Sequence, residues 1–271
     1  MKTVLFFFLS TLSWTSLGQD SIAYEWKNKG EFQIAESALW EVDAFENVYA
    51  SNGNSIKKFD QDANLQFSQS IKRLGRMSQL VLVNTMKLIH FSEEQQTLCY
   101  FDNTLSEMDD CVELSDEGVI NASLVSGSSQ PNKIWVLDNL NSTLSLFSLD
   151  KLIQEQQISN LKGTLNIENI SDIKEHGSRL YLLDETQGIY VFDLYGSLLD
   201  FIPGKSIQQF AVVGSTLYTL IEGALKIRSI DTEEKISVKL PIDKVFDFQI
   251  QNGNFFLRAK NTVHKFELVF H

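Results

Sequence analysis

Six pairs of short apolar segments recur along this chain at intervals of roughly 40 residues. The pairs begin near residues 47, 87, 133, 179, 216 and 254, so successive starts are separated by 40, 46, 46, 37 and 38 residues. The best-preserved copies read KIWVLDNLNSTLSLFSLDK (133–151) and RLYLLDETQGIYVFDLYG (179–196). A period of this length indicates that one supersecondary unit is repeated along the chain.

Each unit has the sequence pattern of successive β-strands. Runs of four to six residues rich in Ile, Val, Leu, Tyr and Phe are separated by Gly, Asn and Asp, and a further strand precedes each pair. Runs such as IWVL and LYLL are apolar on both faces, so both faces of these strands must be covered. Four short strands per unit of about 40 residues are typical of a propeller blade. The sequence therefore predicts an all-β fold, a six-bladed β-propeller. A pair of packed β-sandwiches is the alternative, but it does not explain six copies.

We expect one propeller domain over residues 19–271. The predicted blades span about 38–71, 78–116, 120–160, 170–204, 207–241 and 245–271. The chain ends before the last blade has an outer strand. The N-terminal stretch at about 21–34 can supply that strand, which would close the ring with the other end of the chain.

The segment GIYVFDLYG (188–196) resembles the NHL repeat, whose third strand commonly reads aromatic-Asp-x-x-Gly. The resemblance is good over 179–202, fair over 47–71 and loose elsewhere. It implies a propeller that is used mainly for binding. In this pattern Phe192 packs into a neighbouring blade, Asp193 starts the turn, and Gly196 adopts a positive φ.

Residues 1–18 have the pattern of a secretory signal peptide. Lys2 precedes a short apolar stretch, and small and polar residues lead to Ser16-Leu17-Gly18. The stretch is too short for a membrane span. We therefore expect an exported protein, periplasmic or extracellular, and favour a bacterial envelope. The net charge of -12 argues against nucleic acid as a partner, because binding to phosphate needs clustered Lys and Arg.

The chain has two cysteines, Cys99 and Cys111, which leave one possible intramolecular pairing. In an exported protein this count favours a structural disulfide, across a hairpin centred near Leu105. Two buried free thiols are the alternative.

Signals for catalysis are weak, since no GxSxG, HExxH or glycine-rich phosphate loop is present. We predict no cofactor, with Ca²⁺ as the alternative, because six-bladed lactonases hold calcium in the central channel. Loops that lead into inner strands carry oxygen ligands suited to such an ion. These candidate metal ligands are Glu117, Asn121, Glu168, Asn169 and Asp243.

The expected function is that of a non-enzymatic binding or scaffold module for a protein or envelope component. A calcium-dependent, lactonase-like hydrolase is the alternative. The predicted binding surface lies on the face with the loops into inner strands and the turns between second and third strands. Its candidate residues are Arg73, Arg76, Glu93, Asp184, Glu185 and Glu222. Asp138 and Asp184 occupy equivalent repeat positions, so a turn-capping role is the competing explanation for Asp184.

Overall fold

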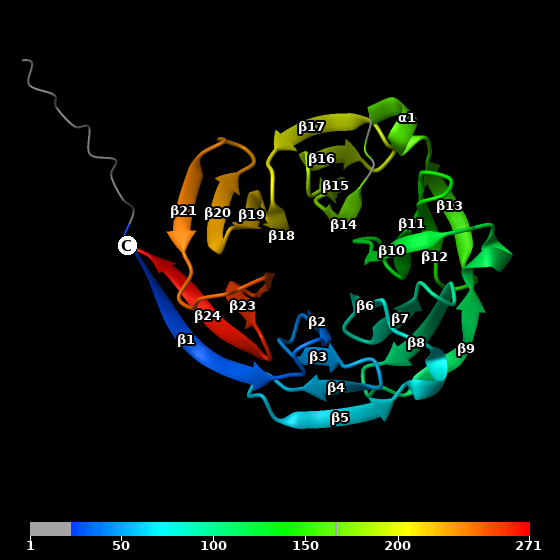
Figure 1. Ribbon diagram of the computed structural model, residues 1–271, viewed down its shortest axis with the longest axis horizontal. Helices are drawn as coiled ribbons and strands as arrows, with labels where there is room; N and C mark the ends of the chain where they lie inside the picture. The colour runs from blue at the N-terminus through cyan, green and yellow to red at the C-terminus, as the bar shows by residue number, and fades with distance from the viewer. Residues whose placement is uncertain (1–22, 166, 168) are drawn as a thin grey trace, which may run out of the picture.

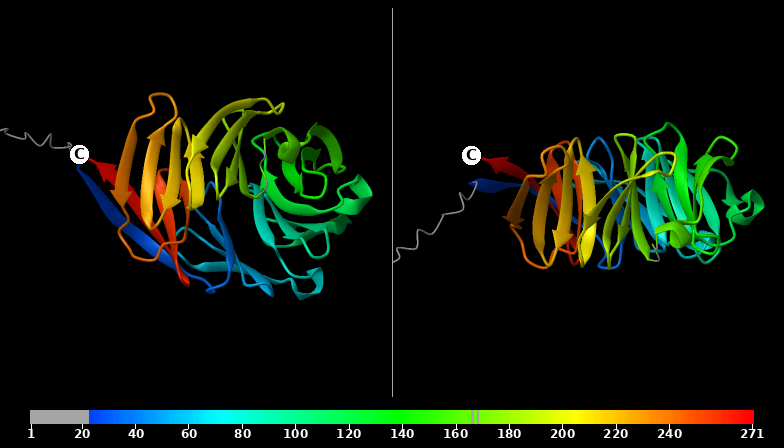
Figure 2. Two further views of the ribbon diagram at one scale, coloured as in Figure 1. Left: turned by 45° about the horizontal axis from the view of Figure 1, so that its top comes forward. Right: turned by 90° about the horizontal axis from the view of Figure 1, so that it is seen from above.

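The computed structural model describes residues 23–271 except residues 166 and 168. These residues form six antiparallel sheets of four strands, arranged in a ring (Figure 1) that is flat when viewed from the side (Figure 2). The predicted six-bladed β-propeller is thereby confirmed. The predicted signal peptide, residues 1–18, lies outside the described residues. Within the part that is described, no helix has the length and apolar character needed to cross a membrane.

The first three blades follow one another along the chain. Blade 1 contains β2 (Leu39–Val42), β3 (Val48–Ser51), β4 (Ser55–Phe59) and β5 (Leu65–Ser70). Blade 2 contains β6 (Gln79–Asn84), β7 (Lys87–Ser92), β8 (Thr97–Asp102) and β9 (Glu107–Glu113). Blade 3 contains β10 (Ala122–Gly127), β11 (Lys133–Asp138), β12 (Thr143–Ser148) and β13 (Ile153–Ile158). Short helices lie in the connections: η1 (Lys72–Leu74), η2 (Leu114–Glu117) and α1 (Leu161–Leu165).

The remaining blades complete the ring. Blade 4 contains β14 (Ile170–His176), β15 (Arg179–Asp184), β16 (Gly188–Asp193) and β17 (Leu198–Pro203). Blade 5 contains β18 (Ile207–Val213), β19 (Thr216–Ile221), β20 (Ala224–Ser229) and β21 (Lys235–Lys239). Blade 6 contains β22 (Asp247–Gln251), β23 (Asn254–Ala259), β24 (Thr262–Phe270) and, as its outer strand, β1 (Tyr24–Gln33).

Strand β1 closes the ring from the other end of the chain. It pairs antiparallel with β24 from Tyr24 opposite Phe270 to Gln33 opposite Thr262, with a bulge between Asn28 and Gly30. Figure 1 shows the two strands side by side, in blue and red. Trp26 of β1 donates from Nε1 to the carbonyl oxygen of Lys239 at 2.9 Å, which ties the closing strand to blade 5. The predicted closure is confirmed.

The hydrophobic core lies between the faces of adjacent blades. One cluster contains Trp135 and Leu146 of blade 3 together with Leu180 and Phe192 of blade 4, all almost fully buried. Phe192 therefore packs into a neighbouring blade, as the repeat predicted. Because each such sheet has neighbours on both faces, its middle strands are apolar on both sides.

The aromatic-Asp-x-x-Gly pattern forms a capped turn between the third and fourth strands of blade 4. The Asp193 carboxylate accepts hydrogen bonds from the backbone N–H groups of Tyr195 and Ser197 at 2.9 and 2.8 Å. Gly196 has a φ of 92°, a conformation that L side chains rarely adopt. The turn from Asp60 in blade 1 is built in the same way, with Ala63 at a φ of 64° in the position of the glycine.

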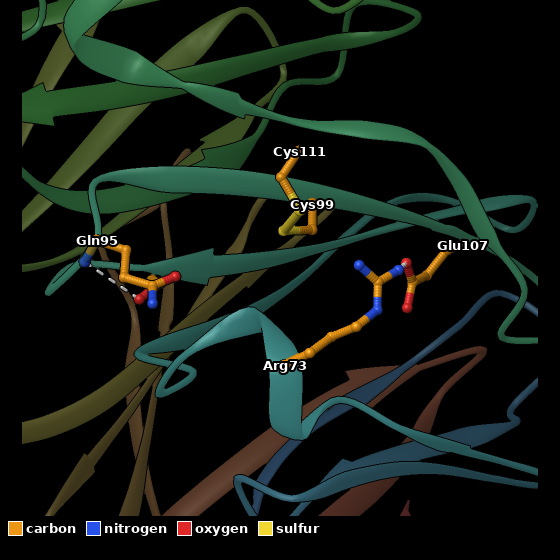
Figure 3. The surroundings of a disulfide bond; sticks show 6 residues. Arg73, Gln95, Cys99, Glu107 and Cys111 are labelled. Carbon is orange, nitrogen blue, oxygen red and sulfur yellow. Dashed lines mark hydrogen bonds and ion pairs between the residues drawn. A yellow bond between two sulfur atoms is a disulfide. The ribbon is translucent and has the colours of Figure 1, made fainter.

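Cys99 and Cys111 form a disulfide between β8 and β9, with a Cα–Cα distance of 4.3 Å. Figure 3 shows the bond joining the two neighbouring strands. Leu105 lies in the turn between them and is 1% exposed. The predicted pairing is confirmed.

Candidate functional site

Two regions of the ring gather polar side chains around a cavity. One lies on the face that carries the loops into inner strands and the turns between second and third strands, which we call the loop face. The other is the central channel, which is lined by the six inner strands β2, β6, β10, β14, β18 and β22. Successive side chains of an inner strand point to opposite faces of its blade, and the inner edges of the blades border the channel.

On the loop face, a groove of about 840 Å³ lies between blades 1 and 2, and we call it the loop-face groove. Its lining residues include Asn52, Arg76, Ser78, Glu93, Glu94 and Asn121. Arg76, Glu93 and Glu94 are exposed, and none of the three takes part in an ion pair within the described residues. The structure thus brings two of the predicted binding residues, Arg76 and Glu93, to one groove. Asn121, which was predicted as a metal ligand, lines the same groove.

The Arg73 side chain does not line the loop-face groove. Its guanidinium forms an ion pair with Glu107 at the start of β9, and Figure 3 shows the side chain extending from η1 towards that carboxylate. Although Arg73 is close to Arg76 in sequence, its charge is used to hold the connection between blades 1 and 2 against the outer strand of blade 2.

Asp184 is not available at the surface, which corrects its inclusion in the predicted binding face. It is 0% exposed, and its Oδ1 accepts hydrogen bonds from Thr186 N and Gln187 N. These hydrogen bonds, with that of the Thr186 hydroxyl, lower the pKa of the Asp184 carboxyl although burial opposes the change. Asp138 caps the equivalent turn of blade 3 by accepting from Leu140 N at 2.9 Å. The capping explanation accounts for both residues.

The other two predicted loop-face residues lie apart from the groove. Glu185 is exposed and lines one end of the central-channel cavity. Glu222 lies in the turn between β19 and β20 with a φ of 49°.

The candidate metal ligands lie in loops that lead into several inner strands. Glu117 ends η2, Asn121 directly precedes β10, Asn169 precedes β14, and Asp243 is exposed before β22. Glu168 lies outside the described residues. In the described part of the chain, no three His, Cys, Asp or Glu side chains are grouped so that they could hold a metal ion.

The central channel contains a cavity of about 430 Å³, with a further cavity of about 350 Å³ lined by some of the same residues. Both cavities are lined by Glu41 of β2 and by Asp172 and Lys174 of β14. Sequence analysis missed these residues. The signal was present, because charged residues two apart in DIK (172–174) share one face of a strand, and Glu41 interrupts an otherwise apolar strand.

Polar side chains in the channel wall join one inner strand to the next. Gln79 of β6 accepts from Val125 N of β10 at 2.7 Å, and Ser126 of β10 donates to the Ile173 carbonyl of β14 at 2.7 Å. Gln249 of β22 accepts from Val42 N and donates to the Trp40 carbonyl, which joins blade 6 to blade 1. These amide and hydroxyl groups are therefore committed to holding the blades together.

Asp247 is also committed to the channel wall. Its carboxylate accepts a hydrogen bond from Trp40 Nε1 at 2.6 Å and another from Gln209 Nε2 at 3.2 Å. The two donors come from blades 1 and 5, so Asp247 links its own blade to both neighbours.

Two carboxyl groups of the channel, those of Glu41 and Asp172, have raised pKa values. Burial raises the pKa of Glu41 to about 8; repulsion from Asp247 and Asp172 adds to the shift, and Lys174 opposes it. Burial also raises the pKa of Asp172, which forms an ion pair with Lys174 at 3.1 Å. Burial lowers the pKa of Lys174, but the attraction of the Asp172 and Glu41 carboxylates is stronger. The pKa of Lys174 is therefore raised. The arrangement places three carboxyl groups around one ammonium.

No family model matches the chain, and no curated protein matches its sequence. Solved structures match over most of the chain at low identity. The WD40 domain of Pan2 from Neurospora crassa is 8% identical with a TM-score of 0.63, and the match covers 89% of this chain and 94% of that one.

Two lyase structures match similarly. A streptogramin B lyase is 10% identical with a TM-score of 0.64, and the match covers 92% of this chain and 98% of that one. The virginiamycin B lyase from Staphylococcus aureus is 9% identical with a TM-score of 0.64, covering 91% of this chain and all of that one. At these identities the comparisons show the fold alone, and they agree with the propeller that the NHL-like repeat implied.

Proposed function

We propose that this protein is an exported, non-enzymatic binding module that holds a protein or cell-envelope partner on its loop face. The observation that carries the proposal is the loop-face groove, where Arg76, Glu93 and Glu94 are exposed and have no partner charge within the described residues. Charges of both signs at one groove favour a partner that carries the complementary charges.

An apolar pair beside the groove supports a protein partner. Ile120 and Leu140 of blade 3 are 60% and 64% exposed, and Ile120 directly precedes the groove residue Asn121. Asp138 holds both backbones, since it accepts from Ile120 N and Leu140 N at 2.9 Å each. Exposed apolar side chains next to a polar rim are typical of protein interfaces.

The disulfide supports the proposed location. Disulfides persist in oxidising compartments, including the bacterial periplasm and the cell exterior. The Cys99–Cys111 bond joins two strands of one blade, so a protein kept in a reducing compartment would lose this link.

The test is a pull-down from envelope extract with the protein as bait and quantitative mass spectrometry as readout. The triple variant Arg76→Glu, Glu93→Lys, Glu94→Lys reverses the groove charges and should lose the partners that the native protein retains. The matched control is Lys151→Glu, Asp62→Lys, Asp231→Lys, which makes the same charge changes in exposed turns between third and fourth strands. Unchanged recovery with the groove variant would show that the partner binds elsewhere.

A calcium-dependent hydrolase is the second candidate, because two of the similar structures are lyases and the fold therefore carries enzymes. Its test is a melting curve in EDTA and then with added Ca²⁺. A large rise in Tm on adding Ca²⁺ would favour the hydrolase, since a ligand that binds only the folded state stabilises it. A flat curve would leave the binding module as the better proposal.

A further inference from the structure

Glu41 lines the channel and forms no ion pair within the described residues. Asp247 accepts hydrogen bonds from Trp40 and Gln209, and Asp172 is paired with Lys174. The neighbour that hydrogen-bonds Glu41 is the Gln249 amide, which is already bonded to the backbone of blade 1. The solvent-accessible part of the Glu41 side chain lines both channel cavities.

The surroundings of Glu41 favour the arrival of a positive charge. Glu41, Asp172 and Asp247 all line the cavity of about 430 Å³, together with the exposed Glu185 and the cations Lys174 and Arg258. Lys174 is paired with Asp172, and Arg258 donates to the carbonyl oxygens of Ala38 and Glu36, so the carboxyl groups of the cavity outnumber its cations. Burial raises the pKa of Glu41 to about 8, which favours the uncharged carboxyl more than at an exposed glutamate. A ligand cation beside Glu41 would favour the ionised carboxylate, because opposite charges interact strongly where water is scarce.

Lys174 shows which kind of cation the channel accommodates. Its ammonium lies 3.1 Å from the Asp172 carboxylate and 5.4 Å from the centre of the Phe210 ring, so one carboxylate and one aromatic face hold it. The Asp172 oxygen in this ion pair, Oδ2, is shielded from solvent. The channel wall therefore already holds one ammonium group, and Glu41 offers a second carboxylate that lines the same cavities.

We propose that the central channel binds a small aliphatic primary amine, whose ammonium group pairs with Glu41. A cavity of about 430 Å³ is within the range of small-molecule sites. Because the ammonium displaces the proton of Glu41, binding is coupled to release of that proton. This site is separate from the loop-face groove and does not depend on the function proposed there.

The experiment is isothermal titration of the full protein with butylammonium, from pH 6 to pH 9, at each pH in two buffers of different ionisation enthalpy. The probe stays charged over this range, as a lysine ammonium does. Affinity should increase with pH until Glu41 is ionised, and the two buffers should reveal proton release at neutral pH. Glu41→Gln should weaken binding by at least about tenfold at the upper end of the range and remove its pH dependence.

Two controls make the result specific. Glu234→Gln removes an exposed carboxyl group in the turn between β20 and β21 and should leave binding unchanged. Butanol, which lacks the charge, should bind much more weakly. Absence of saturable butylammonium binding up to about 10 mM would overturn the proposal. So would equal binding of butanol, equal affinity of Glu41→Gln, or Glu41-dependent binding of Ca²⁺ in place of the amine.

Discussion

The Lys265 ammonium of β24 lies 2.5 Å from Glu46 Oε2, in the turn between β2 and β3, and this ion pair joins the last blade to the first. The two side chains are 11% and 12% exposed, and Asn254 also donates to the Glu46 carboxylate. We expect Lys265→Met to lower the free energy of unfolding by about 3 kcal/mol, because it leaves a buried carboxylate without its cation. Denaturant unfolding at neutral pH measures this change.

Lys29→Met is the matched control, since Lys29 pairs with Glu267 in the same blade but both side chains are 42% exposed. Its cost should stay below about 1 kcal/mol, as for other surface ion pairs. Equal costs for the two variants would show that the Lys265 pair has no special part in closing the ring.

The same ion pair should make the free energy of unfolding depend on pH in the acidic range. Burial opposes ionisation of Glu46, but the hydrogen bonds from Lys265 and Asn254 outweigh it and lower the pKa below 4.5. The stabilisation is therefore complete above pH 4.5 and is lost as the pH falls through the lower folded-state pKa. The difference between the native protein and Glu46→Gln should shrink below pH 4.5. A difference independent of pH would contradict this assignment.

The turns that begin at Asp193 and Asp60 should differ in their response to a methyl group at the fourth turn position, which is Gly196 in one and Ala63 in the other. A Cβ on Gly196 would lie 2.8 Å from Ile158 Cγ2, and the φ of 92° is itself unfavourable for alanine. Gly196→Ala should cost about 2 kcal/mol or more in the free energy of unfolding. Ala63→Gly should be nearly neutral, since relief of the left-handed backbone is offset by about 0.5–1 kcal/mol of extra chain entropy. A neutral Gly196→Ala would be inconsistent with the tight turn.

The disulfide should contribute measurably to stability. It closes a loop with a sequence separation of 12, for which loss of unfolded-state entropy corresponds to roughly 3 kcal/mol. We expect reductant to lower the Tm of the native protein and to leave the double variant Cys99→Ala, Cys111→Ala unaffected. Intact-mass analysis should show two alkylations only after reduction. Equal labelling without reductant would mean that the purified protein carries free thiols.

His90 should make the protein less stable at mildly acidic pH. It is 0% exposed in β7, and burial lowers its pKa although the backbone of Gly75 opposes the shift. The unfolded chain therefore binds a proton near pH 6.5 that the folded chain takes up only at lower pH. Stability then falls as the pH drops below about 6.5, by at most about 1.4 kcal/mol per pH unit.

Unfolding between pH 7 and pH 5 tests this dependence. His90→Leu should flatten it, whereas His271→Gln, which removes an exposed histidine at the chain end, should not. The same slope in His90→Leu and in the native protein would assign the acid sensitivity to other groups.

Features that depend on short segments could be predicted from the sequence. The turn capped by Asp193 and the disulfide between Cys99 and Cys111 each involve residues within one hairpin. These features can be predicted because a turn brings the Asp193 carboxylate to its own backbone, and adjacent strands of a hairpin bring the two cysteines together. The burial of Asp184 was harder to predict, since a turn aspartate has the same sequence signal whether its carboxylate faces solvent or its own backbone.

By itself, the sequence determined the repeat, the strand pattern and the number of blades, because the period and the apolar runs reflect local structure. The tertiary structure alone decided which charges meet. Glu41, Lys174 and Asp247 come from blades 1, 4 and 6 and converge only when the ring closes. Arg258 of β23 likewise donates to the carbonyl oxygens of Ala38 and Glu36 across the closing junction. The members of these sets are separated by more than seventy residues, so no local pattern records them.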